Sequence, residues 1–457
     1  MSVVTPVSSI SAAKAIPNAY DQIDSRPLTG HQKSLVALAV VGNIAEFFDI
    51  FMVGFVISLL TGAWSLTGVQ AGIITSCTGL GTVVGSILWG RMSDRIGRRG
   101  SFRWCVIFFL TFTVLTLFIP DGGWWLYALC RVGVGMGVGG LNITSIPYVQ
   151  EFVPSKQRGL LSGLASVFIP MGLLLGSICQ RVVGDNWRML VSLSLVSALL
   201  LIWIQFVPES PRFYLLHGRE DKARKSLAWA LNMPENEVGA MPKVDVEQKA
   251  SYGELLSHHL RPLVIVALGS FCFILGSFAI QSWGQTLLKD AFGFETEMVA
   301  YLFMGVAVAD CAGRFGSAWL ADRIGRRWTM FLYGMIGAAA CFAAAFFHPS
   351  GWIFYVEVLI IMMFADGVFG IINAFGSEQF PNAVRSTGIG LGYGLGATAK
   401  IVGPSLMGVL VGGGAVSQNI SLNVVTTAFG FFGCCLVVGA VIYLFARETK
   451  GKDLESL

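Results

Sequence analysis

Charged residues are scarce in this sequence. Only 13% of its 457 residues are Asp, Glu, Lys or Arg, whereas 54% are apolar. A soluble domain carries about a quarter charged residues, so the composition argues against an ordinary soluble protein. Three long runs contain no Asp, Glu, Lys or Arg at all: Ile50–Gly90, Trp328–Val356 and Ile401–Ala446. Since a membrane-spanning helix needs ~20 apolar residues, these runs predict a protein that crosses a membrane several times.

The residue patterns that usually indicate ATP binding, disulfides, metal binding or catalysis are also missing from the sequence. The chain has no Walker phosphate-binding loop, so ATP is not expected to drive it directly. The nine cysteines all fall in apolar segments, which indicates packing and not disulfides or a CxxC metal site. The histidines lie in tails, a connector and a loop, without supporting metal ligands: His31, His217, His258, His259 and His348. No candidate nucleophile is paired with a candidate base, so we do not expect an enzyme. We also expect no cofactor, no metal and no nucleic-acid partner.

The apolar segments predict an all-α polytopic membrane protein with twelve transmembrane helices. We place them at residues 35–60, 69–90, 103–119, 124–148, 159–181, 189–207, 261–288, 297–320, 327–347, 352–376, 386–411 and 422–446. They divide into two six-helix bundles, 35–207 and 261–446, joined by a connector at 208–260 that contains a helix-favouring stretch, Arg219–Leu231. Residues 1–34 are expected to be a loose tail without a cleavable signal peptide, and 447–457 a second tail.

Basic residues gather in alternate loops. The loops after the second and eighth spans hold Arg91, Arg95, Arg98, Arg99, Arg103, Arg323, Arg326 and Arg327. The loops on the other side hold only Arg181, Arg188 and Lys289 as bases. The positive-inside rule therefore predicts cytoplasmic termini and a cytoplasmic connector, in a plasma membrane of the bacterial inner-membrane type.

Two landmarks occur once in each half of the chain. Residues 94–99 read Asp-Arg-Ile-Gly-Arg-Arg, and residues 322–327 repeat the same six letters. Glu151, Pro154 and Arg158 recur as Glu378, Pro381 and Arg385, at nearly the same offset. A duplicated membrane unit is typical of a transporter whose substrate site lies between the halves.

At these landmarks the chain resembles the major facilitator superfamily. Gly90–Arg99 is similar to the family's signature between spans 2 and 3, and the second copy has Ala318 where the pattern has Gly. Pro208–Arg212 and Glu448–Gly451 are similar to motifs of its sugar-porter and organic-ion branches, with Arg447 in place of the usual Pro. The resemblance covers nearly the whole chain and implies a transporter fold that functions as a monomer.

The resemblance also implies a conformational latch at the repeated loops. Its residues are Gly90, Asp94, Arg95, Arg98, Glu151, Arg158, Asp322, Arg326, Glu378 and Arg385. Asp94 sits beside a helix end, where a carboxylate can face the positive N-terminus of a neighbouring span. The arginines can pair with Glu151 and Glu378 and close the cytoplasmic side when the halves meet. The alternative is that these bases only fix the topology.

Charged residues inside spans are costly, so each one is a functional hypothesis. Glu46 and Asp49 lie on adjoining parts of span 1, and Arg131 opens span 4. At about 1.5 Å per residue, Asp49 and Arg131 lie at nearly the same depth and can meet. In the sugar-porter branch, an Asp and an Arg at these two positions form the proton-coupling pair. The alternative is a static buried pair, and Glu46 is either a second proton site or a structural hydrogen-bonding group.

Lys400 is the charge in the second half that lacks a partner on its own helix. Its ammonium group suits a substrate carboxylate, and organic-anion members of the family likewise tend to carry a base in this span. The alternative is an ion pair with Glu357 on the adjacent helix. Asp310 and Arg314, four residues apart, are expected to neutralise each other.

Polar and aromatic residues near these charges are candidates for the cavity lining. They are Gln281, Trp283, Gln285, Phe48, Asn373 and Tyr393. Their rings offer flat faces and their amides offer orienting hydrogen bonds. A hexose is disfavoured, because Gly370 is followed by Ile371 and Ile372 and not by the Pro-x-x-Trp run of sugar porters.

The sequence therefore predicts proton-coupled uptake of a small organic acid, with an aromatic carboxylate as one possibility, by alternating access. A carrier of a neutral metabolite or an organic cation remains an alternative, because acids outnumber bases in the spans. From another class, a transporter-like membrane receptor would bind without turnover.

Overall fold

The computed structural model describes residues 18–157, 166–241, 252–347, 350–381 and 384–450, together with Leu161 and Leu164. It does not describe the side chains of Asn142, Lys156, Tyr252, Glu254, Arg385 and Ser386. Across these ranges the chain is helical and has no strand, apart from two isolated bridges, Asn18 with Ala240 and Thr67 with Ala415.

The helices follow one another in two series. The first series is α1 (Ala19–Ser25), α2 (Gly30–Ala63), α3 (Gly68–Ile96), α4 (Arg98–Leu117), α5 (Trp124–Gln150), η1 (Ser155–Gln157), α7 (Pro170–Val183), α8 (Trp187–Ser192), η2 (Leu193–Ala198), α9 (Leu199–Trp203) and η3 (Ile204–Phe206). The connector holds α10 (Pro211–Leu216), α11 (Glu220–Leu231), η4 (Glu235–Glu237) and α12 (Tyr252–His258). The predicted helix at Arg219–Leu231 is thereby confirmed.

The second series begins at α13 (Leu260–Thr286). It continues through η5 (Leu287–Ala291), α14 (Thr296–Ile324), α15 (Arg326–Phe346), α16 (Gly351–Ile361), η6 (Met362–Asp366), η7 (Gly367–Gly370), α17 (Ile372–Glu378), α18 (Arg385–Gly396), α19 (Ala399–Val411), α20 (Val416–Asn419) and α21 (Leu422–Leu444). Both η5 and η6 are π-helical turns.

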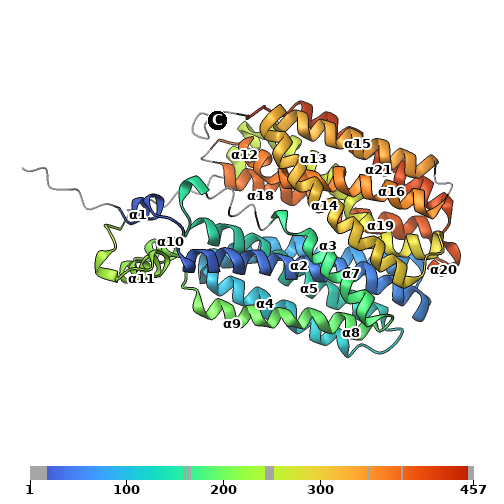
Figure 1. The fold of residues 1–457 in the computed structure, drawn as a ribbon, viewed down its shortest axis with the longest axis horizontal. Coiled ribbons are helices and arrows are strands. Elements are labelled where there is room, and N and C mark those ends of the chain that lie inside the picture. Colours follow the sequence, from blue (N-terminus) through green and yellow to red (C-terminus); the bar gives the residue numbers. More distant parts are fainter. Residues whose placement is uncertain are drawn as a thin grey trace, which may run out of the picture.

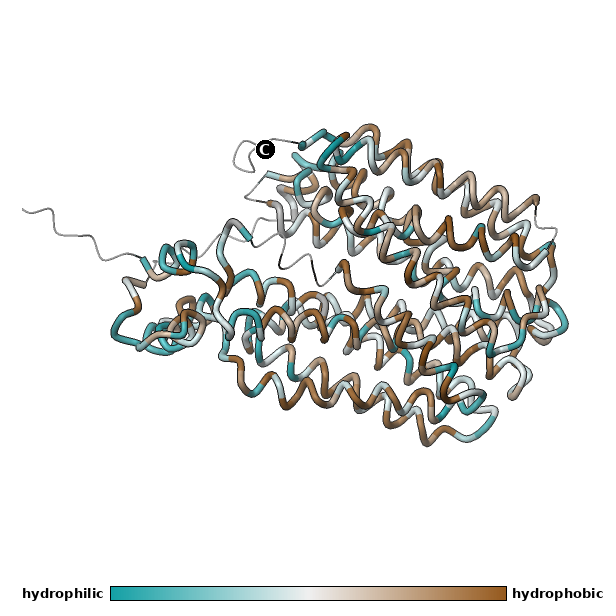
Figure 2. The backbone as a smooth tube through the Cα atoms, viewed as in Figure 1, coloured by the Kyte–Doolittle hydropathy of each residue, from teal (hydrophilic) through white to brown (hydrophobic). Residues whose placement is uncertain are grey.

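Eleven helical segments among the described residues are long and apolar enough to cross a membrane. They correspond to eleven of the twelve predicted spans, and Figure 2 shows how apolar residues dominate along them. The predicted span at 159–181 lies partly outside the described residues. Its described part is α7, a 14-residue apolar helix.

Side-chain caps set where the first two long helices begin. Thr29 Oγ1 accepts a hydrogen bond from the Gln32 backbone N–H at 3.2 Å, and Gln32 Oε1 accepts one from the Thr29 N–H at 2.9 Å. Thr67 and Gln70 repeat this arrangement at the start of α3, at 3.2 and 3.0 Å. Each box satisfies two backbone donors that a helix start leaves free. The cap explains why α2 begins at Gly30 and not at the predicted residue 35.

The long helices form two groups that lie against each other. Figure 1 shows α2–α9 as one group and α13–α21 as the other, with α1, α10 and α11 beyond one end. We call that end the connector end, and the opposite end, where the loops around Ser65 and Gly413 lie, the far end. Within the groups, α3 packs on α5 and α15 packs on α21.

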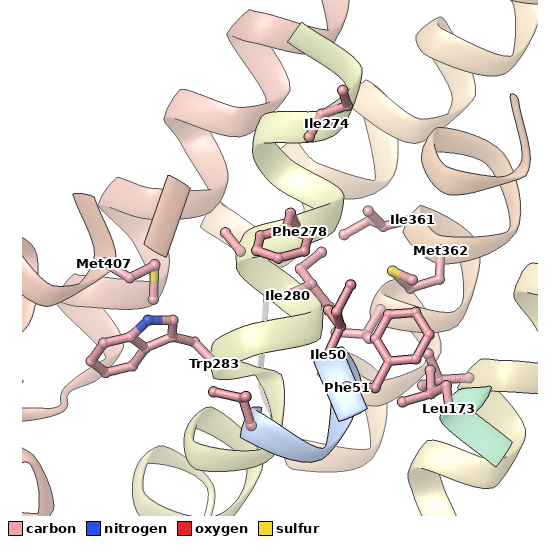
Figure 3. Packing of buried hydrophobic residues seen from close by; sticks show 14 of the residues in the cluster. Ile50, Phe51, Leu173, Ile274, Phe278, Ile280, Trp283, Ile361, Met362 and Met407 are labelled. Atoms are coloured by element: carbon pink, nitrogen blue, oxygen red, sulfur yellow. The ribbon is translucent and has the colours of Figure 1, made fainter. Parts of the chain in front are cut away.

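Three pairs of helices make most of the contact between the two groups: α3 with α19, α7 with α14, and α2 with α13. Figure 3 shows Ile50 and Phe51 of α2 in one apolar cluster with Ile280 of α13. At the far end Lys289 Nζ donates to the Ser58 carbonyl at 3.0 Å, and Arg181 pairs with Glu297. Among the described residues, the bonded contacts between the groups run from the middle of the bundle to the far end.

The described part of the N-terminal tail is folded, so the prediction of a loose tail over 1–34 is wrong there. Ile23 of α1 is buried in a small apolar cluster with Leu227 and Leu231 of α11. Asp24 accepts a hydrogen bond from the Ser155 backbone N–H at 2.6 Å. The apolar contacts explain the order, because Ile23 would otherwise be exposed to water.

Candidate functional site

The first group of helices holds a buried ion pair near its centre. Arg131 Nη2 of α5 lies 2.7 Å from Asp49 Oδ2 of α2, and each side chain is 2% exposed. Ser194 Oγ donates to Asp49 Oδ1 at 3.0 Å, and Arg131 Nε donates to Thr78 Oγ1 at 3.2 Å. The predicted meeting of Asp49 and Arg131 is confirmed. The hydrogen bonds from Ser194 and to Thr78 were not predicted, since hydroxyl residues are common in these spans.

Glu46 lies one turn before Asp49, and its carboxyl group has no hydrogen bond or ion pair with the described residues. It is 2% exposed, and Oε2 is enclosed without a partner. The hollow beside it is mostly apolar and includes Phe109, Leu141 and Leu200. The charge of Lys400, on the other group of helices, acts on Glu46 across the interface.

The second group holds a larger buried cluster around Arg314. Arg314 Nε donates to Asp310 Oδ1 at 2.9 Å, and Nη2 donates to Asp366 Oδ2 at 2.5 Å. Gln281 Nε2 donates to the other oxygen of Asp366 at 3.2 Å, and Arg314 Nη1 donates to the Ser166 carbonyl at 3.0 Å. The expected pairing of Asp310 with Arg314 is confirmed, but the cluster also includes Asp366. That contact depends on the π-turn η6, which the sequence did not reveal.

Lys400 on α19 lies between aromatic rings from both groups. Its Nζ is 5.8 Å from the centre of the Phe47 ring on α2 and 5.7 Å from that of Phe278 on α13. Its side chain is half-buried and makes no ion pair with the described residues. Glu46 and Asp366 act on its charge from a greater distance. Phe278 was missed in the sequence, although it lies three residues before Gln281 on the same helix.

The alternative pairing of Lys400 with Glu357 is wrong. No ion pair joins them in the described part of the chain, and Glu357 Oε2 is enclosed without a hydrogen-bond partner. Glu357 lies on α16, which packs against α14 and α15, whereas Lys400 lies on α19, which packs against α3 and α13. A similar depth in two helices does not bring two side chains together when the helices pack against different neighbours.

The other predicted lining residues divide into two sets. Gln281 reaches Asp366, and Tyr393 is half-buried where the charges of Arg314, Asp366 and Glu46 act on it. Gln285 and Trp283 are fully buried, and their side-chain polar atoms have no hydrogen-bond partner among the described residues. Figure 3 shows Trp283 pointing toward Met407 of α19.

Phe48 and Asn373 are less central. Phe48 is buried in the apolar cluster around α2, and Asn373 is half-buried in the first turn of α17. Of the predicted lining residues, Gln281 and Tyr393 therefore lie beside the buried charges, whereas Phe48 lies among apolar side chains.

The latch residues form matched ion pairs at the connector end of each group. Arg98 lies 3.3 Å from Glu151 and 3.4 Å from Asp94. Arg326 lies 3.7 Å from Glu378 and 3.3 Å from Asp322. Gly90 and Arg95 lie in the last two turns of α3. Both predicted pairings are confirmed, but each joins helices of one group and not the two groups.

Part of the predicted latch cannot be placed. Arg158 lies outside the described residues, and so does the side chain of Arg385. The side chain of Glu151 is described. Burial raises the pKa of its carboxyl group above the ordinary value, and the charge of Arg98 partly offsets this rise.

Two further glutamates complete the matched loops. Glu209 accepts hydrogen bonds from the backbone N–H groups of Arg99 and Gly100 at 3.0 and 3.2 Å. Glu448 does the same for Arg326 and Arg327 at 3.0 and 3.1 Å. These carboxylates face the positive ends of α4 and α15. We expected Asp94 to fill this role, but the carboxylate at the start of α4 is Glu209, from the Pro208–Arg212 motif.

The hydroxyl residue that follows each of these glutamates bonds to the latch. Ser210 donates to Glu151, and Thr449 donates to Glu378. The motifs after spans 6 and 12 therefore hold the loops after spans 2 and 8, in the same way in both halves.

Side chains that could bind a metal ion are scattered through the described part of the chain. Within the described ranges, no three His, Cys, Asp or Glu side chains gather closely enough to hold a metal ion. All nine cysteines are free thiols.

Comparisons with known proteins agree with this architecture. Residues 35–457 match the family model described as "Sugar (and other) transporter". The niacin transporter NiaP of Acinetobacter baylyi is 26% identical, over 95% of this chain and 98% of that protein. The cis,cis-muconate transport protein of the same organism is 25% identical, over 90% of this chain and 94% of that protein. The crystal structure of a D-xylose-proton symporter matches with a TM-score of 0.73 at 20% identity, over 93% of this chain and 100% of that one.

Proposed function

The chain belongs to the sugar (and other) transporter family of the major facilitator superfamily, and we propose that it takes up a small aromatic carboxylate together with protons. The family consists of membrane transporters and not of enzymes. Nicotinate, a pyridine ring with one carboxylate, represents the class of substrate.

The surroundings of Lys400 carry this proposal. Among the described residues, no carboxylate is in direct contact with its ammonium group, which lies between Phe47 and Phe278. A cation without a bonded anion offers a site for a substrate carboxylate, and the two rings offer flat surfaces for an aromatic ring. Because Phe47 and Phe278 belong to different groups of helices, the substrate would contact both.

The relatives support an acidic substrate. Niacin and cis,cis-muconate, which the two relatives are named for, are both organic acids. At 25–26% identity this agreement does not identify the substrate of the chain, but it favours an acid over a neutral sugar.

The Asp49–Arg131 pair supports the proton coupling. While the Asp49 carboxylate and the Arg131 guanidinium are 2.7 Å apart, each compensates the charge of the other. If Arg131 moves away, the buried carboxylate loses that compensation, and uptake of a proton becomes the less costly state. Return of Arg131 would then release the proton on the other side.

The contacts between the two groups of helices support alternating access. These contacts run from the middle of the bundle to the far end, which corresponds to a state open toward the connector end. The basic loops at the connector end face the cytoplasm under the positive-inside rule, in a plasma membrane of the bacterial inner-membrane type. In this proposal both termini are cytoplasmic and the monomer is the functional unit, with bundles at 35–207 and 261–446.

The proposal is tested by measuring nicotinate binding to purified Lys400→Gln. Hydrogen bonds to charged groups contribute about 1.5–3 kcal/mol, so affinity should fall roughly tenfold to hundredfold. Lys400→Arg should retain part of the binding, although its planar fork differs in shape. The matched control is Lys33→Gln, an exposed lysine outside the bundle core, which should bind as the wild type does. Unchanged affinity in Lys400→Gln would refute the anion site.

An organic-cation carrier is the second candidate, and Glu46 is the observation that favours it. Its carboxyl group has no bonded partner in the described part of the chain, so it offers a site for a cation. In that case Glu46→Gln would abolish binding of a pyridinium probe such as 1-methylnicotinamide, and Lys400→Gln would strengthen it. The carboxylate proposal predicts that neither variant gains or loses binding of this probe, because the wild type does not bind it.

A further inference from the structure

The Asp310–Arg314–Asp366 cluster contains more negative than positive charge. One guanidinium faces two carboxylates, at 2.9 Å from Asp310 and 2.5 Å from Asp366. The side chains of Asp310, Asp366 and Arg314 are 0%, 3% and 4% exposed. With both carboxylates ionised, two negative charges and one positive charge would leave an unbalanced charge inside a membrane-embedded bundle, which is costly.

The two carboxyl groups also lie next to each other. The same guanidinium nitrogen, Arg314 Nη2, lies 3.4 Å from Asp310 Oδ2 and 2.5 Å from Asp366 Oδ2, so the two carboxyl groups are neighbours. Two adjacent carboxylates resist double ionisation, and one proton held between them removes the repulsion. The remaining negative charge is then matched by Arg314.

Among the described residues, no other group supplies the missing positive charge by direct contact. Gln281 of α13 gives Asp366 a neutral hydrogen bond, and Tyr333 of α15 donates to the Gly313 carbonyl. Tyr393 of α18 is uncharged when protonated, and Cys311 is a neutral thiol beside Asp310.

More distant charged groups do not change this balance. Lys400 of α19 acts on Asp366 without forming an ion pair, and its charge is opposed by Glu46 of α2. Glu357 of α16 is acidic and would add negative charge.

We infer that Asp310 and Asp366 share one proton, so that this cluster is a second proton site in the C-terminal half, separate from the Asp49–Arg131 pair. The proton lies between a carboxyl oxygen of each residue, and Arg314 holds the charge that remains.

The site also lies at the interface between the two groups of helices. Arg314 Nη1 donates to the Ser166 carbonyl, which belongs to the other group. A movement of the groups past one another breaks this bond and changes the surroundings of the guanidinium that compensates the shared charge. Proton occupancy is therefore connected to the position of the halves.

Infrared difference spectroscopy of the purified protein in lipid tests the inference without any substrate. A protonated carboxyl group gives a C=O band that shifts in D2O, and carboxyl-13C aspartate separates Asp from Glu46 and Glu357. The background is Asp49→Asn with Asp290→Asn, which removes the other two aspartates that are not exposed within the described residues. We expect an aspartate band at neutral pH in this background, and its absence would overturn the shared proton.

Two single variants then locate the proton. In Asp310→Asn or Asp366→Asn, the remaining carboxylate pairs with Arg314 alone and should ionise, so the band should vanish in both variants. Loss in only one variant would overturn sharing, and persistence in both would place the proton elsewhere.

Asn resembles the neutral form of Asp, which favours folding of both variants. If either variant fails to fold, the labelled background protein still decides whether a protonated aspartate is present. A negative result leaves the Lys400 proposal intact, because nicotinate binding is measured separately.

Discussion

Single buried residues in this protein differ in how completely their charges are matched. Asp49 receives hydrogen bonds from Arg131 and Ser194, whereas Lys400 and Glu46 have no bonded partner among the described residues. A matched pair changes state only when its partner moves, whereas an unmatched group can take up a ligand or a proton directly. In the function that we propose, the matched Asp49 therefore carries the proton coupling and the unmatched Lys400 binds the substrate.

Replacement of Asp49 tests that assignment. Asp49→Asn should abolish proton-driven accumulation of nicotinate but leave exchange of nicotinate down its own gradient, because the amide cannot titrate. Acidification inside proteoliposomes, followed with a pH-sensitive dye, is the measurement. Asp121→Asn, at an exposed ion pair with Arg188, is the control and should acidify normally. Proton movement that persists with the substrate in Asp49→Asn would contradict the role of Asp49.

The sequence predicted single contacts where helix geometry alone decides them. Depth along a helix follows from its rise per residue, so the meeting of Asp49 and Arg131 could be predicted. Which helices pack against each other could not be predicted in this way, and therefore Glu357 of α16 was wrongly considered as the partner of Lys400 of α19. The Arg314–Asp366 contact was missed for a related reason, because the π-turn η6 shifts the register of its helix.

At the scale of elements, the connections between α3 and α4 and between α14 and α15 are tight turns of one residue. Gly97 and Gly325 each end one helix and precede the next, with φ of 86° and 100°. Glu209 and Glu448 lie against these glycines and cap the helices that follow. The repeated loop sequence predicted the matched halves, but the glutamates that hold the loops come from the ends of the bundles and could not be paired with them by spacing.

Two nearby glycines, Gly97 in the turn and Gly100 in the helix that follows, allow backbone strain to be compared with ordinary helix propensity. Gly97→Ala should lower stability by about 1–3 kcal/mol, since backbone in this region is strained for any residue with a Cβ. Its Cβ would also lie only 2.2 Å from Glu209 Oε2. Gly100→Ala, three residues later inside α4, should be neutral or stabilising, because its Cβ would meet nothing closer than 3.6 Å. Chemical unfolding of both variants gives the comparison, and equal stability would contradict the account of this turn.

At the scale of the whole molecule, the backbones of the two groups of helices come into close contact at the far end. A Cβ on Gly72 of α3 would lie 2.9 Å from the Gly408 Cα of α19. Contact of two backbones at this distance requires glycine on both sides. The sequence showed that glycine is frequent, but it could not show which glycines face each other across the halves.

A larger residue at this contact should force the far end open. Gly408→Leu should increase the distance between labels on Val182 of α7 and Phe346 of α15, measured by pulsed electron resonance in a cysteine-depleted background. The control is Gly413→Leu, because nothing lies within 4 Å of the position that its Cβ would take. An unchanged distance in Gly408→Leu would show that this contact does not hold the far end closed.

The most direct test of the central claim is counterflow of labelled nicotinate in proteoliposomes. The claim is that the halves move around a substrate carboxylate bound by Lys400. Wild-type protein and Lys33→Gln should exchange external label for internal unlabelled nicotinate. At a concentration well below saturation, Lys400→Gln should exchange it at least tenfold more slowly. Binding without counterflow in the wild type would indicate a receptor and contradict transport of this substrate. Counterflow by Lys400→Gln at the wild-type rate would contradict the proposed binding site.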